Sequence, residues 1–438
     1  MLAAVLNGLP VTRAHIRVTV IVGLGLFFDF FDVFLAGVIG TVLTTSFQLS
    51  PTLLPVVLGS SFLGMFFGAT CMGTLADRVG RRPAYLINLG IYSLFTLLGA
   101  CSVNPQMLAL TRFLAGIGIG AEVPLSDTYL SELLPAKHRG QLIAWAYTIG
   151  FLGIPAVGLL ARMLVPQTPF GVAGWRWLFV AGSLGGASVW VVRRGLPESP
   201  RWLESVGRTK QAAEIVAQMA GESAFQDADT TEAVAPLPWR ALFTRQYRAR
   251  TFMLWVFHIF QTVGYYGFGT IVPLVLAAKG FSVLTSLTYT TLAFIGYPAG
   301  SLLSLLFVER MERRWLIMCS ALLMAVFGLL LGYVTTPFAI VSFGLLYTIT
   351  SNIFSNAFHI FQGEIFPTAI RATATGSAYG LSRLSSALMP FVLLPVLQRF
   401  GAAVMFATIA GAMIIVIADI GLFAPQTTGR TLEEINRE

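Results

Sequence analysis

The sequence predicts an all-α membrane protein with twelve transmembrane helices, arranged as two six-helix pseudo-repeat bundles. Three observations predict it: the composition, a single polar segment that divides the apolar stretches evenly, and an internal repeat. Of the 438 residues, 56% are hydrophobic and only 11% are charged, and the mean hydropathy is +0.77. A soluble chain of this length needs more charge to cover its surface, so a bilayer must solvate most of this one.

The apolar stretches are long enough to cross a bilayer, which takes about 20 residues per helix. We expect spans at 17–44, 52–76, 82–102, 105–133, 139–165, 175–193, 251–277, 283–308, 314–334, 337–365, 371–398 and 402–423.

The basic residues indicate how these spans are oriented. The net charge is +8, but most of the 28 Lys and Arg residues fall in alternate loops, in the central polar segment and at the two ends. The intervening loops carry only scattered examples, such as Lys279 and Arg399. By the positive-inside rule both termini are cytoplasmic. The basic excess is therefore a topology signal, and no nucleic-acid partner is expected.

Neither cofactor chemistry nor catalysis is expected. The three cysteines, Cys71, Cys101 and Cys319, fall inside expected spans without metal-ligand spacing, so we interpret them as packing residues. The sequence offers no nucleophile–base pair and no phosphate-binding glycine loop, so we predict no catalytic residues, no metal and no organic cofactor. The first apolar stretch is too long for a cleavable signal peptide.

Residues 194–250 form the one sizeable polar segment and divide the spans six and six. This predicts an N-terminal bundle at 1–193, a cytoplasmic loop at 194–250, and a C-terminal bundle with a cytoplasmic tail at 251–438. Ser199 and Pro200 are typical of the N-cap and first position of a helix, which we expect to lie on the cytoplasmic side. Residues 221–236 have the composition of a flexible linker.

Two separate loops of the first half return in the second half at one constant offset. The run Asp77-Arg78-Val79-Gly80-Arg81-Arg82 returns as Glu309-Arg310-Met311-Glu312-Arg313-Arg314, and Glu132, Pro135 and Arg139 return as Glu364, Pro367 and Arg371. Chance would rarely make two loops agree. Parallel halves of this kind are known from transporters whose substrate site lies near the membrane midplane, between the halves.

The loop that runs from Gly73 through Asp77-Arg78 to Gly80-Arg81-Arg82 resembles the signature loop of the major facilitator superfamily. Residues 197–203, the pattern from Arg112 to Gly120 and the tail at 429–434 resemble its sugar-porter branch. The resemblance covers nearly the whole chain. It implies the major facilitator fold, with two bundles that rock around a central site, and a proton symporter of sugars or of metabolites such as organic, aromatic or nicotinate-like acids.

Ionisable residues inside spans cost on the order of 2.5–3.5 kcal/mol each at a helix centre. Asp29 and Asp32 resemble the acidic motif of proton-coupled organic-acid and metabolite symporters, although Phe30 stands where that motif has Gly. In proton-coupled sugar porters the equivalent of Asp32 pairs with that of Arg112. Separating this pair in a dry site would make Asp32 take up a proton, which couples proton movement to rocking; the alternative is a static ion pair. Glu122 is expected either to carry a proton or to anchor Arg112.

Arg383 is the residue most informative about the substrate. It lies about 12 residues into its span, hence roughly 18 Å deep at ~1.5 Å per residue. An Arg keeps its charge, and its planar guanidinium can donate two parallel hydrogen bonds to a carboxylate. Organic-anion members of the superfamily resemble this chain in having a basic residue at this place in the span. The alternative is pairing with an internal acid such as Asp29. Polar residues of two further spans complete the expected pocket: His258, Gln261, Tyr265, Asn352, Asn356 and His359.

Charged loop residues resemble the salt-bridge network that joins the two bundles on the cytoplasmic side when such transporters face outward. The members are Asp77, Arg78, Arg82, Glu132, Arg139, Glu198, Arg201, Glu364 and Arg371. Single surface pairs are weak, but a network that breaks and re-forms can bias a two-state equilibrium by about a few kcal/mol. These residues can also simply set the topology, and the two roles are compatible.

We therefore expect a proton-coupled symporter that imports a small organic anion, such as an aromatic or heteroaromatic carboxylate, by alternating access. A sugar or polyol symporter is the main alternative; the loop motifs favour it, but Tyr266 replaces the Asn that sugar porters usually have. Proton-driven efflux is a further alternative, and a membrane enzyme or a non-transporting receptor would be a different class. The expected partners are substrate, protons and the lipid bilayer, with the protein a monomer. Short loops and the lack of Asn-x-Ser/Thr sites favour a bacterial inner (plasma) membrane.

Overall fold

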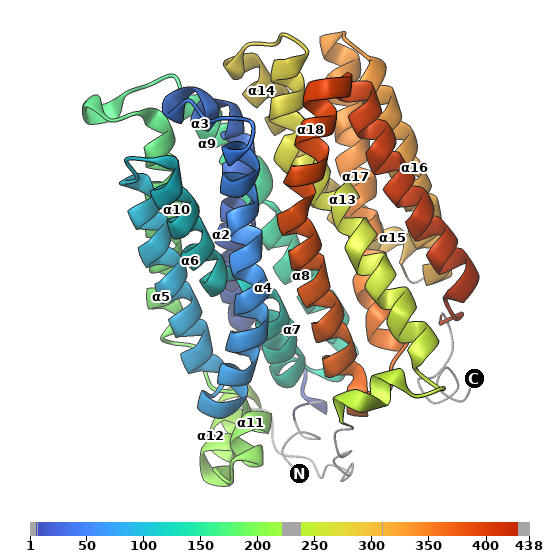
Figure 1. Cartoon of the computed structure of the whole chain (residues 1–438). Helices are drawn as coiled ribbons and strands as arrows, with labels where there is room; N and C mark the ends of the chain where they lie inside the picture. Colours follow the sequence, from blue (N-terminus) through green and yellow to red (C-terminus); the bar gives the residue numbers. More distant parts are fainter. Residues whose placement is uncertain (1–5, 7, 221–237, 309, 428–438) are drawn as a thin grey trace.

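The computed structural model describes residues 6, 8–220, 238–308 and 310–427, apart from the side chains at 73, 74, 77, 136, 368, 369 and 372. All regular structure in these ranges is helical (Figure 1), which confirms the predicted fold class. The helices of the first half are α2 (Arg13–Val38), α3 (Gly40–Phe47), α4 (Leu53–Val79), α5 (Arg81–Ala100), α6 (Pro105–Gly120), α7 (Glu122–Leu133), α8 (Arg139–Phe151), α9 (Gly153–Leu164) and α10 (Gly174–Arg193). Those that follow are α11 (Pro200–Ser205), α12 (Thr209–Ala220), α13 (Arg248–Ala278), α14 (Val283–Phe294), α15 (Gly296–Phe307), α16 (Arg313–Tyr333), α17 (Pro337–Glu364) and α18 (Thr368–Phe423). Short 3-10 turns lie at Ala136–His138, Pro169–Gly171 and Trp239–Phe243.

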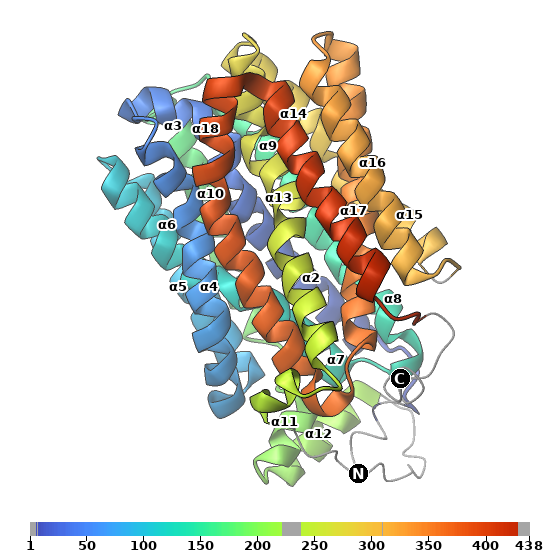
Figure 2. The same cartoon turned by 45° about the vertical axis from the view of Figure 1, so that its right-hand side comes forward.

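Each of the twelve predicted spans corresponds to a helix, to a closely joined pair of helices, or to one arm of α18. Among the described residues, 10 helical stretches are long and apolar enough to cross a membrane. The last of them holds two predicted spans, because α18 turns back on itself at Gly401 (Figure 2), where φ is 82°. Glycine adopts this left-handed conformation without steric cost. The remaining predicted span, 175–193, matches the 20 residues of α10.

The two halves lie side by side, as both ribbon views show (Figures 1 and 2). Across their interface α4 packs along α18, α2 along α13, α9 against α14, and α8 against α15. Helix α2 begins, and α18 ends, toward the end of the molecule where α11 and α12 are found. We call this the terminal end, and the opposite one the far end.

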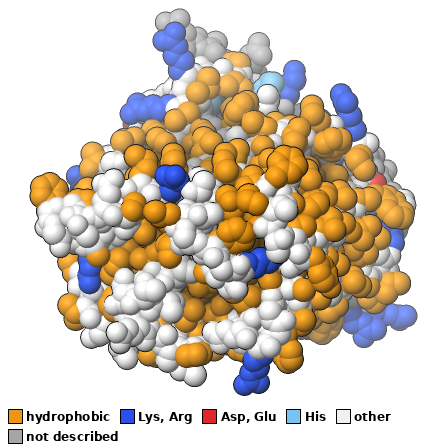
Figure 3. Space-filling model, turned by 90° about the horizontal axis from the view of Figure 1, so that it is seen from above, with side chains coloured by type: hydrophobic (Ala, Val, Ile, Leu, Met, Phe, Trp, Pro, Cys, Tyr) orange, Lys and Arg blue, Asp and Glu red, His pale blue; other side chains and the backbone are white. Residues whose placement is uncertain are grey.

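Aromatic side chains and glycines close the interface toward the far end. The Phe34 ring of α2 contacts three rings of the second half, Tyr266, Phe294 and Tyr297, at centroid distances of 6.1, 5.7 and 5.6 Å. These four rings pack together across the interface between the two halves. Gly37 makes the close approach possible, because a Cβ at this position would lie 2.6 Å from the Thr270 Cα. Small residues at helix interfaces allow such contact between backbones. The far face is mostly hydrophobic, with Lys and Arg side chains scattered singly (Figure 3).

The internal repeat is visible as matching contacts in the two halves. Arg81 of α5 pairs with Glu132 of α7 at 3.0 Å, and at the equivalent positions Arg313 pairs with Glu364 at 3.4 Å. In the same way, Arg139 donates to the Leu134 carbonyl and Arg371 to the Phe366 carbonyl. The offset found in the sequence is therefore a structural equivalence.

The predicted helix start at Ser199 and Pro200 is confirmed. The Ser199 hydroxyl accepts from the Trp202 backbone N–H at 3.2 Å, and α11 begins at Pro200. At the end of α12, the Met219 carbonyl accepts a hydrogen bond from the Thr12 hydroxyl. These short helices are thus held against the terminal end of the first half. The predicted linker at 221–236, the repeat position Glu309 and the tail motif at 429–434 lie outside the described residues.

Candidate functional site

A cavity lies between the two halves, near the middle of α13 and of the first arm of α18. Its empty space is about 480 Å³, including the part that is open to solvent. Helices α2, α7 and α8 supply one wall, and α13, α17 and α18 supply the other. The lining side chains are Phe30, Val123, Tyr147, Phe151, His258, Gln261, Tyr265, Tyr266, Ser355, Phe358, His359, Tyr379, Ser382 and Arg383. Acidic side chains are missing from this described lining, so its only permanent charge is the positive charge of Arg383.

Arg383 has aromatic neighbours but no acidic partner. Its side chain is 5% exposed, and its guanidinium carbon lies 4.8 Å from the Tyr266 ring centroid and 4.4 Å from that of Tyr379. Its Nε and Nη1 atoms have no hydrogen-bond partner within the described chain. Aromatic faces stabilise a cation by an amount on the order of 2 kcal/mol when it is desolvated, which does not offset the burial of a full charge. The described cavity lining therefore leaves the charge of Arg383 without a counter-charge.

Two histidines of the lining are linked by one glutamine. The His258 Nε2 atom lies 3.2 Å from the Gln362 Oε1 atom, and the Gln362 Nε2 atom lies 3.2 Å from the His359 Nδ1 atom. With His258 donating and His359 accepting, His359 keeps its Nε2–H as a free donor. The bridge fixes both rings relative to α13 and α17. Gln261 and Tyr265 of α13 also line the cavity.

Asn352 and Asn356 do not belong to the cavity lining, and this part of the predicted pocket is wrong. Asn352 donates to the Tyr297 carbonyl, and Asn356 donates to the Ser304 hydroxyl at 2.6 Å. Both amides thus join α17 to α15 inside the second half. Buried amides in a membrane protein need such partners because there is no water to satisfy them.

Asp32 and Arg112 form the pair expected from the resemblance. Both are at most 1% exposed. The Arg112 Nη1 atom donates to both carboxylate oxygens of Asp32, at 2.6 and 2.8 Å, and Nη2 donates to the Asp32 carbonyl at 2.9 Å. The Thr96 and Ser61 hydroxyls complete the site at 3.3 Å each. The pair joins α2 to α6 within the first half.

Glu122 pairs with Arg193 of α10, and not with Arg112. Glu122 and Arg193 are each 1% exposed, and the Arg193 guanidinium also covers the Tyr85 ring at 4.3 Å. Asp29 lies within electrostatic reach of this pair. The alternatives in which Glu122 anchors Arg112, or Asp29 neutralises Arg383, are therefore wrong for this structure.

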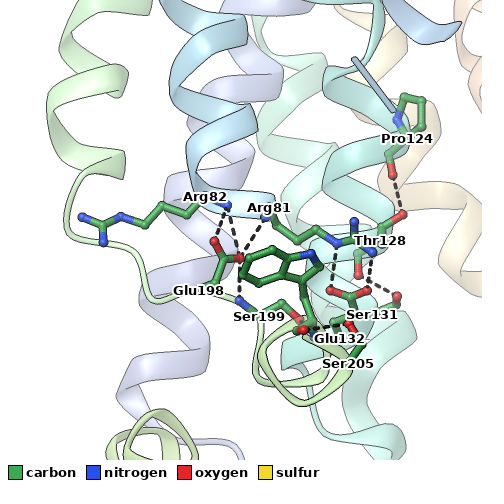
Figure 4. A network of polar contacts seen from close by, with 10 residues as sticks. Arg81, Arg82, Pro124, Thr128, Ser131, Glu132, Glu198, Ser199 and Ser205 are labelled. Atoms are coloured by element: carbon green, nitrogen blue, oxygen red, sulfur yellow. Dashed lines mark hydrogen bonds and ion pairs between the residues drawn. The ribbon is translucent and has the colours of Figure 1, made fainter. Parts of the chain in front are cut away.

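At the terminal end, Glu198 and Glu132 organise the loop after α4 (Figure 4). The Glu198 carboxylate accepts from the backbone N–H groups of Arg81 at 2.9 Å, Arg82 at 3.2 Å and Ser199 at 2.8 Å. Burial raises the pKa of Glu198, while these backbone hydrogen bonds act in the opposite direction. Glu132 is held by Arg81 instead of Arg78 or Arg82. The side chain of Arg82 reaches the Arg194 carbonyl.

Both ion pairs resolved for the predicted network, those of Glu132 and Glu364, lie within one half. Arg139 and Arg371 bond to carbonyls close to them in sequence. Arg78 is exposed at the end of α4, Arg201 is half-buried in α11, and the side chain of Asp77 lies outside the described residues. In this structure the described network fixes loops within each half.

Several residues of the site were missed by sequence reasoning. Arg193 is the last residue of the predicted span 175–193 and was not singled out, yet its side chain turns inward to Glu122. The signal that could have found it was Glu122, an intramembrane acid whose one suggested partner, Arg112, was already expected to pair with Asp32. Tyr266 was noted only as a departure from sugar porters, and Tyr147 not at all, because an aromatic residue in an apolar span carries no pattern of its own.

Two equivalent halves with a partly open cavity between them define a membrane transporter. Residues 18–438 match the family model described as "Sugar (and other) transporter". The chain therefore belongs to the sugar (and other) transporter family of the major facilitator superfamily, and it is a transporter, not an enzyme.

Named relatives and solved structures agree with this assignment. The chain is 30% identical to the putative metabolite transport protein YyaJ of Bacillus subtilis (strain 168), over 98% of this chain and 96% of that protein. It is 29% identical to the niacin transporter NiaP of Acinetobacter baylyi (strain ATCC 33305 / BD413 / ADP1), over 98% of both chains. Its fold is similar to that of the xylose transporter XylE from E. coli in a partially occluded inward open conformation, with a TM-score of 0.82 and 20% identity over 96% of this chain and 100% of that one.

Proposed function

We propose that this transporter is a proton-coupled symporter that imports a small organic anion, and that Arg383 binds the carboxylate. The observation that carries the proposal is a buried guanidinium on the cavity wall without an acidic partner among the described residues. A carboxylate can accept two parallel hydrogen bonds from a guanidinium. A neutral sugar would leave the charge uncompensated, which is costly in a dry site.

The aromatic walls favour a planar ring attached to that carboxylate. Tyr266 and Tyr379 flank the guanidinium, and Phe30, Phe151 and Phe358 contribute further ring surface. His359 and Ser382 offer polar contacts for a ring substituent or heteroatom. The likeness to a niacin transporter, named for a pyridine carboxylate, supports a heteroaromatic acid as the class.

Proton coupling is assigned to the buried acids of the first half, with Asp32 and Arg112 as the pair whose separation drives it. The ion pair with Arg112 favours the charged form of the Asp32 carboxylate while the two side chains stay together. If rocking draws Arg112 away, the carboxylate is left in a dry environment and must take up a proton. We further infer a monomer in a bacterial inner membrane with the terminal end facing the cytoplasm, since that end carries most of the basic residues.

A sugar or polyol symporter is the second candidate. The likeness to the arabinose-proton symporter of Bacillus subtilis (strain 168), at 26% identity over 98% of this chain, favours it. Gln261 is the cavity residue best suited to sugar hydroxyls, whereas Arg383 offers no advantage to a neutral ligand. The two candidates therefore differ in how they depend on Arg383.

The test uses protein reconstituted in liposomes with a pH dye inside, to which aromatic carboxylates, nicotinate, aliphatic acids, hexoses or polyols are added outside. Protein-free liposomes correct for permeant acids. We expect acidification evoked by one of the ring carboxylates, and its loss in Arg383→Ala and Asp32→Asn. Acidification by a hexose that survives in Arg383→Ala would overturn the anion proposal. Uptake of labelled solute without acidification would overturn proton coupling.

A further inference from the structure

Asp29, Glu122 and Arg193 come from three helices and meet in the interior of the first half, beside the cavity. The Arg193 guanidinium forms an ion pair with Glu122, and its Nη2 atom lies 3.4 Å from the Val22 carbonyl of α2. Gly25 leaves the space for this arrangement: a Cβ there would lie 1.7 Å from the Arg193 Nη2 atom and 2.9 Å from the Glu122 Oε1 atom. The α2 backbone is therefore pressed directly against the ion pair.

Asp29 stands one helical turn after Gly25 on the same face of α2. Its side chain is 2% exposed, and its Oδ2 atom has no hydrogen-bond partner in the described part of the chain. It is repelled by Glu122, attracted by Arg193 and more weakly repelled by Asp32. Two carboxylates thus share the field of one guanidinium.

The count of buried charges in this region does not balance. Asp32 is already matched by Arg112, which leaves Asp29 and Glu122 with Arg193 alone. Hydroxyls also face the cluster, on Tyr85 and Tyr92 of α5 and on Tyr379 of α18. Asp127 of α7 is a separate acid, which accepts a hydrogen bond from the Tyr147 hydroxyl of α8. An unpaired carboxylate in a dry interior is costly, and two acids that share a site do not both ionise readily.

We propose that Asp29 and Glu122 share one proton beside Arg193, and that this cluster is a proton-binding site separate from the Asp32–Arg112 pair. The proton enters from water onto a carboxylate oxygen and leaves the same way, so no other reactant is needed. When the proton is present the cluster is neutral, and when it is absent the cluster carries one negative charge.

This inference rests on the proposed function for its role in transport. Phe30 and Val123, the neighbours of Asp29 and Glu122 in sequence, line the cavity that contains Arg383. Tyr379 is within electrostatic reach of both Arg383 and Asp29. Protonation of the cluster removes a negative charge near the anion site and so favours anion binding, and by linkage the bound anion favours protonation. Proton and anion then occupy the protein together, as symport requires.

The test is infrared difference spectroscopy of the purified full-length protein between acidic and alkaline buffer, without substrate. A protonated buried carboxyl has a carbonyl band that its ionised form lacks. We expect Asp29→Asn and Glu122→Gln each to abolish the same band, because either acid alone is fully paired with Arg193. The double variant should remove nothing more. Asp419→Asn, which changes a buried acid of the second half, should leave this band in place.

Three results would overturn the proposal: a band that persists in both single variants, bands lost additively as from two independent acids, or a wild-type spectrum without a pH-dependent carboxyl band. The variants sit on different helices, so misfolding of one leaves the other informative. The infrared band needs no substrate, and therefore its presence with failed carboxylate uptake would reject the proposed substrate and keep the proton site. Carboxylate uptake together with an infrared band that neither single variant affects would reject the proton site and keep the proposed substrate.

Discussion

The guanidinium of Arg383 lies 4.4 Å from the ring centroid of Tyr379, which stands one turn earlier on the same arm of α18. The two residues thus face the cavity together, and the ring holds the charge in place without neutralising it. Because Tyr266 of α13 lies over the same guanidinium at 4.8 Å, the cation is fixed between two helices. This geometry explains how a charge can be kept in a membrane interior while its Nε and Nη1 atoms have no hydrogen-bond partner among the described residues.

Replacing Arg383 by Lys is expected to lower carboxylate uptake at least about tenfold, although the charge is kept. A lysine ammonium is a point charge that lacks the planar fork and the stacking on Tyr266 and Tyr379. Initial rates of labelled carboxylate uptake into proteoliposomes measure the effect. Arg399→Ala is the matched control, because Arg399 is exposed on the same helix. Equal uptake by wild type and Arg383→Lys would argue that only net charge matters at this position.

Removing one member of the Asp32–Arg112 pair is expected to destabilise the protein and to uncouple it. An unpaired charge left at a site of at most 1% exposure costs about 3–5 kcal/mol. The Tm in detergent should therefore fall in Asp32→Asn and in Arg112→Gln, and partly recover in the double variant. Uphill uptake driven by a pH gradient should be lost in all three. If the double variant regained uphill uptake along with stability, the pair would be structural only.

Gly37→Val is expected to disfavour the arrangement in which the far end is closed. The new Cβ would meet the Thr270 backbone at 2.6 Å, so the halves must separate there. Transport should fall, and a membrane-impermeant thiol reagent added on the far side should label Ser382→Cys in the cavity faster. Gly411→Val is the control, since a Cβ at Gly411 meets nothing within 4 Å. Unchanged labelling and transport would show that contact at Gly37 does not limit opening.

Glu198→Gln is expected to become relatively more stable than wild type as the pH rises. Burial raises the pKa of Glu198 in the folded protein. Its contribution to stability is therefore complete below the pKa of the unfolded chain and is lost as the pH climbs through the folded value. A glutamine cannot ionise and avoids this loss, while its oxygen can still accept from the Arg81 and Ser199 backbone.

The comparison of Tm against pH for wild type and Glu198→Gln checks this expectation. Glu214→Gln serves as the control, because Glu214 is exposed on α12. If the Tm of Glu198→Gln instead fell relative to that of wild type as the pH rises, this expectation would be contradicted. The backbone hydrogen bonds to the ionised Glu198 carboxylate would then outweigh the effect of its burial.

The fold was predictable because its signals are additive over many residues. Apolar length defined the spans, and the repeat of Arg81 and Glu132 as Arg313 and Glu364 defined the two halves. The bend at Gly401 fell between two predicted spans, where a break was required. The same kind of pattern located Arg383, since a charge inside an apolar span stands out against its surroundings.

The partners of these charges were less predictable, because pairing depends on the rotation and depth of each helix. Arg193 sits at a predicted span end, yet it turns inward to Glu122 because Gly25 leaves room for it. Asn352 lies on the same predicted polar face as His359, but it bonds to α15 and not to the cavity. A stripe of polar residues shows which face of a helix is polar, without showing whether that face meets a cavity or another helix.

The most direct measurement is calorimetric binding of matched carboxylate and carboxamide pairs, such as nicotinate with nicotinamide and benzoate with benzamide, with xylose alongside. Each pair differs only in the charge that Arg383 is proposed to bind. At least one acid is expected to bind about tenfold or more tighter than its amide, and Arg383→Ala is expected to abolish this preference. Equal Kd values within every pair, or xylose binding that persists in Arg383→Ala, would contradict this expectation.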